Sequence, residues 1–501
     1  MSIKTASAET SLAGKDSKTK PAAKRNFYKW HRILSLTALV PVIFWTISGL
    51  SHPFMANWFR PFIPQEVFRP LTQDQMKPQL SLQEILDRNH LTEIRNFSLV
   101  NFDQSTFYQV LNRDSSYQYY SADNGNLLPN GDRSYAIYLA RYFTNDKKTP
   151  VKEARLQTGF DDKYQPINHL LPVWKVSFDR PDGMDIYVET SQSRLATFNN
   201  NTRKTFLWIF EQFHTWQFLA VIGGERFRII VLLIIVSIMF LSLVSGLTVY
   251  GLFWKRFKLI RQKQKAADRE DKRFLHRFHR QIGLIVSFVM FTFVVSGAFH
   301  LLVKLRNIQP EKMQYAQLIN RKDLILSNLK LPVANFSVLK TALVRFNNHV
   351  YYQVLNKQKK VLYLDAKSGR ELPNGDQQYA LYLSNFYRNS NQHEIIDQPI
   401  VVTQIKQFDN EYGFINKRLP VEKIGYPNQE NWYIETTSSK LSTTVAGIDR
   451  AEGLSFIFLH KYFGMSWAGK DIRDLVSMLA ALGVLVVSLF GFASFIGNKS
   501  V

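Results

Sequence analysis

Four long apolar segments limit what this chain can fold into. They cover residues 33–54, 229–254, 281–303 and 475–498, and none contains Lys, Arg, Asp or Glu. A helix needs about 20 apolar residues to cross the hydrocarbon core of a bilayer, and each segment is long enough. We therefore expect a membrane protein built as an α-helical four-span bundle.

Two long polar segments lie between these spans, at residues 55–228 and 304–474. In the first, short strands are expected at 97–99 and 108–111, because β-branched and aromatic residues alternate there before an Asn-Gly turn. A helix with Tyr135, Tyr138, Leu139 and Tyr142 on one face should follow. Each polar segment is expected to be a small α+β domain.

The formal charge of +23 is concentrated beside the spans, before residue 33 and in the loop 255–280. Short basic segments flanking spans mark the cytoplasmic side of a membrane. We therefore expect cytoplasmic termini, an irregular basic tail over residues 1–25 and both α+β domains outside the cytoplasm. The first span, which lacks a small-residue cleavage site, should be retained. This distribution of charge favours membrane lipid rather than nucleic acid as the partner.

The second half of the chain repeats the first at an offset of 244 to 248 residues. WHR at 30–32 recurs as FHR at 278–280, and LPNGD at 128–132 recurs at 372–376. Matches occur in spans and polar segments alike. The pattern predicts an internal duplication, in which each copy consists of a span, an outer domain and a second span.

The repeat separates the eleven histidines into matched and unmatched positions. His90, His169, His349 and His393 have no counterpart and are expected to be ordinary surface or core residues, and His276 is an unmatched spare candidate. Three pairs are matched: His31 with His279, His52 with His300, and His214 with His460.

The spacing of the matched histidines would place metal ligands in two layers, one near each face of the membrane. His31 and His52 are 21 residues apart, which is about 31 Å of helix and close to the hydrocarbon thickness. Imidazoles from two helices can ligate a haem iron. Ionisable groups at membrane depth are costly, so six matched histidines at the ends of spans are expected to have a function. We expect a haem ligated by His31 and His279 at the cytoplasmic face. The other four histidines suffice for one or two outer centres, with His52 and His300 the stronger ligand candidates and the pairing left open.

Other residues near these positions have two explanations each. Arg32 and Arg280 could neutralise haem propionates or anchor lipid headgroups. Gly246 and Gly491 could admit a flat macrocycle or simply a neighbouring helix. The histidines themselves could belong to an interfacial belt with the nearby tryptophans. Because the chain contains no cysteine, any haem must be held non-covalently.

The span motifs resemble the PepSY-associated transmembrane family of iron-regulated inner-membrane proteins, which includes ferric-siderophore reductases. The resemblance implies a bacterial inner-membrane protein with two or more b-type haems and PepSY-like periplasmic domains, which carries electrons outward to reduce ferric iron or ferric siderophores. Thr215-Trp216 departs from the family pattern, so His214 and His460 are weaker candidates. The residues that carry the resemblance are HR at 31–32 and 279–280, SGLSH at 48–52, SGAFH at 296–300, FH…GGERFR at 213–228 and LHK at 459–461.

The sequence also bears on the source of the electrons and on two alternative functions. The loop 255–280 is too short for a flavin or nicotinamide domain and has no G-x-G-x-x-G motif, so quinol or a separate reductase must supply electrons. The main alternative is a non-enzymatic envelope protein whose PepSY-like domains bind peptides or restrain a peptidase. A histidine-lined metal transporter is a further alternative, but it predicts acidic residues inside the spans, and these have none.

Overall fold

The computed structural model describes residues 16–67, 69, 78–266, 274–307, 314–324, 338–390 and 398–497. Its contacts divide the chain into two compact units. The helical unit comprises Met1–Trp58, Phe206–Gln309 and Ile448–Val501, and the αβ unit comprises Phe59–Thr205 and Pro310–Gly447.

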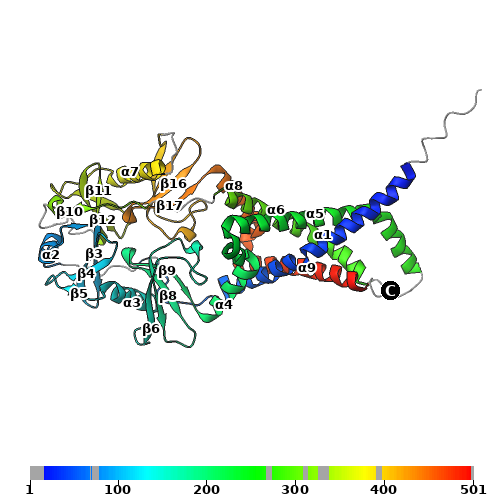
Figure 1. Ribbon diagram of the computed structural model, residues 1–501, viewed down its shortest axis with the longest axis horizontal. Helices are drawn as coiled ribbons and strands as arrows, with labels where there is room; N and C mark the ends of the chain where they lie inside the picture. The colour runs from blue at the N-terminus through cyan, green and yellow to red at the C-terminus, as the bar shows by residue number, and fades with distance from the viewer. Residues whose placement is uncertain are drawn as a thin grey trace, which may run out of the picture. The chain divides into compact units, whose positions relative to one another are not determined.

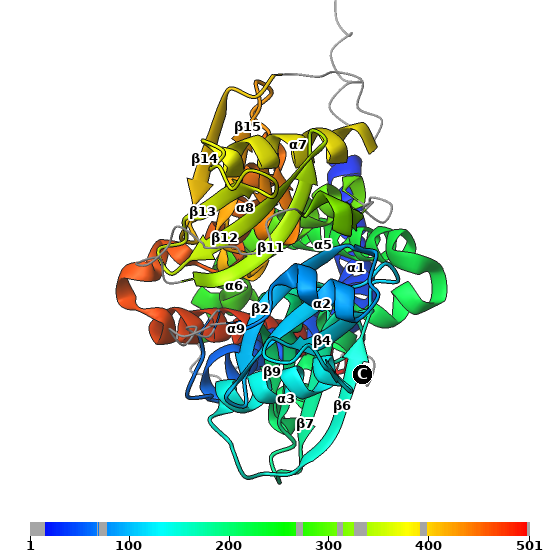
Figure 2. The same cartoon turned by 90° about the vertical axis from the view of Figure 1, so that its left-hand side faces the viewer.

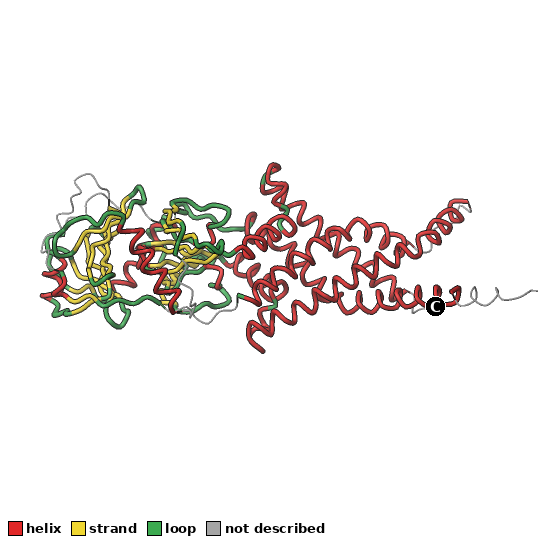
Figure 3. The backbone as a smooth tube through the Cα atoms, turned by 90° about the horizontal axis from the view of Figure 1, so that it is seen from above, coloured by secondary structure: helices red, strands yellow, loops and turns green. Residues whose placement is uncertain are grey.

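Four long helices dominate the helical unit (Figure 3). They are α1 (Asp16–Pro53), α5 (Gln217–Ala266), α6 (Phe274–Arg306) and α9 (Lys470–Gly497). Each contains a window that is long and apolar enough to cross a membrane, which confirms the prediction of four such helices.

The helices extend beyond the expected spans. The structure continues α5 to Ala266, into the basic loop, because the Lys, Arg and Gln residues there are good helix formers. It also begins α1 at Asp16, inside the segment expected to be an irregular tail. Residues 1–15 of that tail and 267–273 of the loop lie outside the described residues.

The four long helices run along the helical unit (Figure 1). Helix α5 contacts α1 and α6, and α9 contacts α6 and α1, so these contacts close a ring of four helices. Small and β-branched side chains fill the middle, as is usual where helices approach closely in a membrane. The buried members of this core are Ala38, Val42, Val236, Met239, Val286, Val294 and Val484. The shorter elements of this part of the chain are η1 (Phe54–Trp58), α4 (Asn201–Phe210), η4 (Glu211–Thr215), α8 (Gly447–Ser455), η8 (Phe456–His460) and η9 (Phe463–Ala468).

The first half of the αβ unit contains two four-stranded antiparallel sheets, in the orders β2-β3-β4-β5 and β6-β7-β8-β9. Helix α3 packs between them, with Tyr135 and Leu139 buried and Tyr138 and Tyr142 partly buried against the same core, so the predicted helix face is confirmed. The elements are α2 (Leu82–Arg88), β1 (Glu93–Ile94), β2 (Asn96–Phe102), β3 (Ser105–Leu111), β4 (Tyr117–Ser121), β5 (Leu127–Leu128), α3 (Gly131–Thr144), β6 (Val151–Gln157), η2 (Pro166–Asn168), β7 (Val173–Phe178), β8 (Asp185–Glu189), η3 (Thr190–Gln192) and β9 (Arg194–Asn199).

The second half has a three-stranded sheet, β11-β12-β13, and a four-stranded sheet, β14-β15-β16-β17, with α7 against the latter. The two halves join through the two-stranded pair β1-β10, and β2 lies beside β11 (Figure 2). The elements are β10 (Ile319–Asn320), η5 (Arg321–Asp323), β11 (Val338–Phe346), β12 (His349–Asn356), β13 (Val361–Asp365), α7 (Gly375–Ser390), β14 (Val401–Ile405), η6 (Phe414–Asn416), β15 (Val421–Gly425), β16 (Asn431–Glu435), η7 (Thr436–Ser438) and β17 (Lys440–Val445).

The LPNGD string begins a helix in the same way in each half. Asn130 and Asn374 both adopt the left-handed conformation with φ of 53°, which asparagine tolerates well. A Cβ on the glycine that follows Asn130 would lie 2.5 Å from Cβ of Tyr119, and a Cβ on the glycine that follows Asn374 would lie 2.7 Å from Cβ of Tyr363. Glycine is therefore required for the helix to begin against the sheet.

A buried group of charged residues, which we call the charge clasp, also joins the two halves of the αβ unit. Arg194 donates from Nε to Glu189, at 2.8 Å, and from a terminal nitrogen to Glu435, also at 2.8 Å. Arg418 donates to the other oxygen of Glu435 at 2.7 Å. Burial alone would raise the pKa of Glu435, but Arg194, Arg418 and Arg69 outweigh it and hold that pKa well below its usual range.

Candidate functional site

The candidate site is a cavity of about 1300 Å³ within the helical unit, which we call the histidine cavity. Residues of all four long helices line it, and His31 of α1 and His279 of α6 are both among them. The structure therefore brings together the two histidines that the sequence predicts as a pair. The cavity is large for a ligand site, since pockets for one drug-sized ligand measure roughly 300–1000 Å³.

Both rings of this pair are oriented through Nδ1. The Nδ1 atom of His31 lies 3.1 Å from the carbonyl oxygen of Ser242, and that of His279 lies 2.9 Å from the carbonyl oxygen of Val487. A carbonyl can only accept, so each Nδ1 carries the proton and each Nε2 is a free acceptor. Among the described residues neither Nε2 has a hydrogen-bond partner. A histidine that ligates a metal through Nε2 usually donates its Nδ1 proton to a carbonyl or a carboxylate in this way.

Two glycines make room for these rings. A Cβ at Gly246 would lie 2.9 Å from Cε1 of His31, and a Cβ at Gly491 would lie 2.9 Å from Cε1 of His279. Real carbon contacts are about 3.5–4.0 Å, so any side chain here would push the ring away. The close approach suggested by the sequence is thus to the imidazole rings.

The two arginines proposed to meet propionates also line the histidine cavity. The guanidinium carbon of Arg32 lies 4.4 Å from the centroid of the Phe495 ring, and that of Arg280 lies 4.2 Å from the Phe257 ring. Each stacks on an aromatic face, and such stacking restrains a guanidinium without neutralising it.

The third matched pair, His214 and His460, lies in direct ring contact. Their centroids are 6.4 Å apart and their planes are inclined at 86°. Nδ1 of His214 lies 3.1 Å from Oγ of Ser48, and Nδ1 of His460 lies 3.2 Å from Oγ of Ser296. Burial, helped by neighbouring cationic or imidazole groups, lowers the pKa of His214 to about 3 and that of His460 to about 4. Both rings are therefore neutral at physiological pH and able to ligate a metal.

The other four matched histidines lie in one row of six aromatic rings, with neighbouring centroids 4.5–6.4 Å apart. In order, the rings are His52, Phe210, His214, His460, Phe456 and His300. The two phenylalanines did not emerge from the sequence as functional candidates. The sequence did contain a sign of them, because each phenylalanine precedes a matched histidine by four residues.

Both central histidines of this row lie near the end of a π-helical turn: His214 is the last but one residue of η4 (Glu211–Thr215), and His460 is the last residue of η8 (Phe456–His460). Single π-turns are rare and occur frequently at functional sites. They differ from an α-turn by one residue, which changes the face on which the histidine lies.

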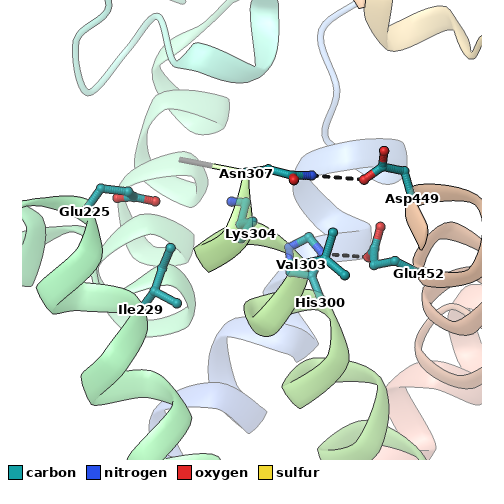
Figure 4. A pocket seen from close by; sticks show the side chains of 8 residues that line it. All are labelled: Glu225, Ile229, His300, Val303, Lys304, Asn307, Asp449 and Glu452. Atoms are coloured by element: carbon teal, nitrogen blue, oxygen red, sulfur yellow. Dashed lines mark hydrogen bonds and ion pairs between the residues drawn. The ribbon is translucent and has the colours of Figure 1, made fainter. Parts of the chain in front are cut away.

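The two ends of the row differ from each other. His300 Nδ1 lies 2.7 Å from a carboxylate oxygen of Glu452, at the side of a pocket of about 310 Å³ that also contains Lys304 and Asp449 (Figure 4). His52 is exposed and contacts Phe210. Of the six candidate histidines, only His300 has a carboxylate as its hydrogen-bond partner within the described part of the chain.

The remaining histidines are placed as follows. His276 lines the histidine cavity, three residues before His279. His90, His169 and His349 belong to the αβ unit, and His393 lies outside the described residues. No group of three or more His, Cys, Asp or Glu residues able to hold a metal ion occurs in the ranges that the structure describes.

The residues that line the histidine cavity are of the kinds that could hold a haem. It presents two Nε2 acceptors from different helices, two arginines beside them, and glycines where a side chain would displace a ligand ring. Comparison with known proteins adds nothing to this, because no family model matches the chain and no curated protein matches it.

Proposed function

We propose that this chain is a b-type haem protein of the bacterial inner membrane that moves electrons outward to reduce ferric iron or ferric-siderophore complexes. The observation that carries the proposal is the arrangement of His31 and His279, whose two unprotonated Nε2 atoms line one cavity. A metal-free structural role would not require both rings to keep that nitrogen unpaired.

The chain's residues would have distinct roles at this site. His31 and His279 would supply the axial ligands, and Arg32 and Arg280 would balance the charge of the propionates. The carbonyls of Ser242 and Val487 hold each ligand ring in position. When bound, the haem supplies a one-electron carrier, and its attachment is non-covalent because the chain has no cysteine.

The row of rings that contains the other four histidines supports a second layer of centres. An internal duplication would explain why the Ser48–His214 contact recurs as the Ser296–His460 contact. Two layers at opposite membrane faces would let electrons cross, and the basic segments beside the spans orient the cavity toward the cytoplasm. The αβ unit would then lie on the outer side as a pair of PepSY-like domains, where the ferric substrate is reduced.

A reduced-minus-oxidised visible spectrum of the purified protein, with haem quantified as the pyridine haemochrome, tests this proposal. The wild type should show a b-type α-band with at least two haems per chain. His31→Ala and His279→Ala should each remove a similar share of that haem, whereas His349→Ala, on the surface of the αβ unit, should remove none. Unchanged haem content in both cavity variants would refute the assignment.

The activity itself requires a second measurement. Vesicles that contain the loaded protein and are supplied with a quinol as electron donor should reduce a ferric chelate, detected as a coloured ferrous complex. A protein that takes up no haem when haem is abundant would instead favour the non-enzymatic envelope protein that binds peptides.

A further inference from the structure

The part of the histidine cavity nearest the first turns of α6 contains polar groups that the haem ligands do not use. Tyr28, His276 and Ser494 all line it. Ser494 is only 8 % exposed, and its Oγ is buried without a hydrogen-bond partner among the described residues. No described residue bonds to the side chains of Tyr28 or His276 either. A buried hydroxyl without a partner is costly, so a ligand is expected to satisfy it.

These groups lie at one level, about one turn from the ligand pair. Helices α6 and α9 are antiparallel. At three positions where a glycine of one helix faces a side chain of the other, residue numbers rise along one helix and fall along the other. The contacts are Val286 with Gly483, Gly283 with Val487, and His279 with Gly491. The next step of this register places His276 opposite Ser494. Tyr28 precedes His31 by the same three residues on α1, which is about 4.5 Å of helix.

We propose that this end of the cavity binds the headgroup of a membrane quinol, the electron donor of the protein. The proposal rests on the proposed function, whose donor it specifies. A quinol carries two ring hydroxyls, which His276 and Ser494 can accept from or donate to, with Tyr28 as a third contact. Its apolar tail would lie along Leu247 and Leu284, which line the same cavity and are 43 % and 44 % exposed.

Two further features favour a quinol over a soluble reductase. The cavity, at about 1300 Å³, exceeds the volume needed for one drug-sized ligand, so a headgroup can occupy it beside a haem. The groups concerned also lie inside the helical unit, on helices long enough to span a membrane, where a lipid-soluble donor can reach them.

The electrons and protons balance without another reactant. A quinol that becomes a quinone breaks two O–H bonds and releases two electrons and two protons. Two ferric ions on the outer side take one electron each and become ferrous. His276 accepts the protons at the headgroup and passes them to water on the cytoplasmic side.

Haem-loaded, full-length protein in anaerobic lipid nanodiscs provides the test, with decylubiquinol as donor and the α-band as readout. Decylubiquinol should reduce the wild type, while His276→Ala and Ser494→Ala should slow that reduction about tenfold each. Dithionite should reduce all of them fully. Ser477→Ala is the matched control, because that serine is on α9 and bonds to the carbonyl of Arg473 instead of lining the cavity.

The outcomes separate the two proposals. Reduction of the wild type by dithionite but not by decylubiquinol would overturn the quinol site and leave the haem protein intact, with a separate reductase as donor. Equal rates in the wild type and both cavity variants would also overturn it. If the chain holds no haem, the proposed function fails, and the quinol site is tested by binding of decylubiquinone to the haem-free protein. Binding to the wild type that both variants lose would support the quinol site. Absence of binding to the wild type would overturn it.

Discussion

Replacing Gly246 by alanine should weaken haem binding through one defined contact. The added Cβ would lie 2.9 Å from Cε1 of His31, about 0.6 Å inside the shortest comfortable carbon contact. In the haem-free protein the ring can turn away at small cost. In the loaded protein a bound haem iron would fix the ring, so the overlap would destabilise the bound state specifically.

The expected size of the effect follows from overpacking. Inserting a methyl group into a well-packed site costs about 1–3 kcal/mol. Because about 1.4 kcal/mol is a tenfold change in affinity, Gly246→Ala should bind haem roughly 5- to 150-fold more weakly. Gly491→Ala should behave alike, since its Cβ would meet His279 at the same distance.

Titration of the haem-free protein with haemin, followed at the Soret band, measures this affinity. Gly251→Ala is the control, because it lies on the same helix and a Cβ there has no heavy atom within 4 Å. Both substitutions raise helix propensity equally, so their difference isolates the contact with the ring. Equal affinities in Gly246→Ala and Gly251→Ala would refute the view that His31 ligates haem in this orientation.

Two further predictions concern the αβ unit. Arg194→Met should destabilise it by about 3–5 kcal/mol in urea unfolding, because Glu189 and Glu435 lose their shared buried counter-ion; a loss below 1 kcal/mol would contradict this. Burial and the neighbouring Asp376 carboxyl raise the pKa of Glu422 to about 9. The folded chain therefore keeps a proton that the unfolded chain releases above about pH 4.5, and this contribution to stability declines as the pH rises toward 9. Glu422→Gln should show a smaller decline over that range, and parallel stability curves would contradict it.

The elements that depend on local pattern were predictable. Charge-free segments of this length give the long helices, because a helix satisfies its backbone polar groups within one segment in a membrane. Alternating residues gave the strands around 97–99 and 108–111, which belong to β2 and β3. That His31 and His279 line one cavity also agrees with the sequence, since each opens an equivalent span; α1 and α6 are not neighbours in the ring of contacts, and all four long helices line the cavity.

The ring row and the charge clasp were not predictable, for physical reasons. The row depends on π-turns, which shift His214 and His460 by one residue relative to the α-helical face that periodicity assumes. The clasp joins Arg194 to Glu435, which are 241 residues apart in the chain. A charged residue in a polar segment gives no sign of burial until its partner is known.

The charge clasp also determines how this chain can be dissected in the laboratory. Glu435 lies in the second half, and one of its hydrogen-bond partners, Arg194, lies in the first. In return Lys417 bonds to the carbonyl of Ala196, and Arg418 to that of His169, both in the first half. Either half expressed alone would contain charged or polar groups that have lost their hydrogen-bond or ion-pair partners in the other half. The two halves must therefore be produced together, and a soluble fragment for structural work has to join 59–205 to 310–447.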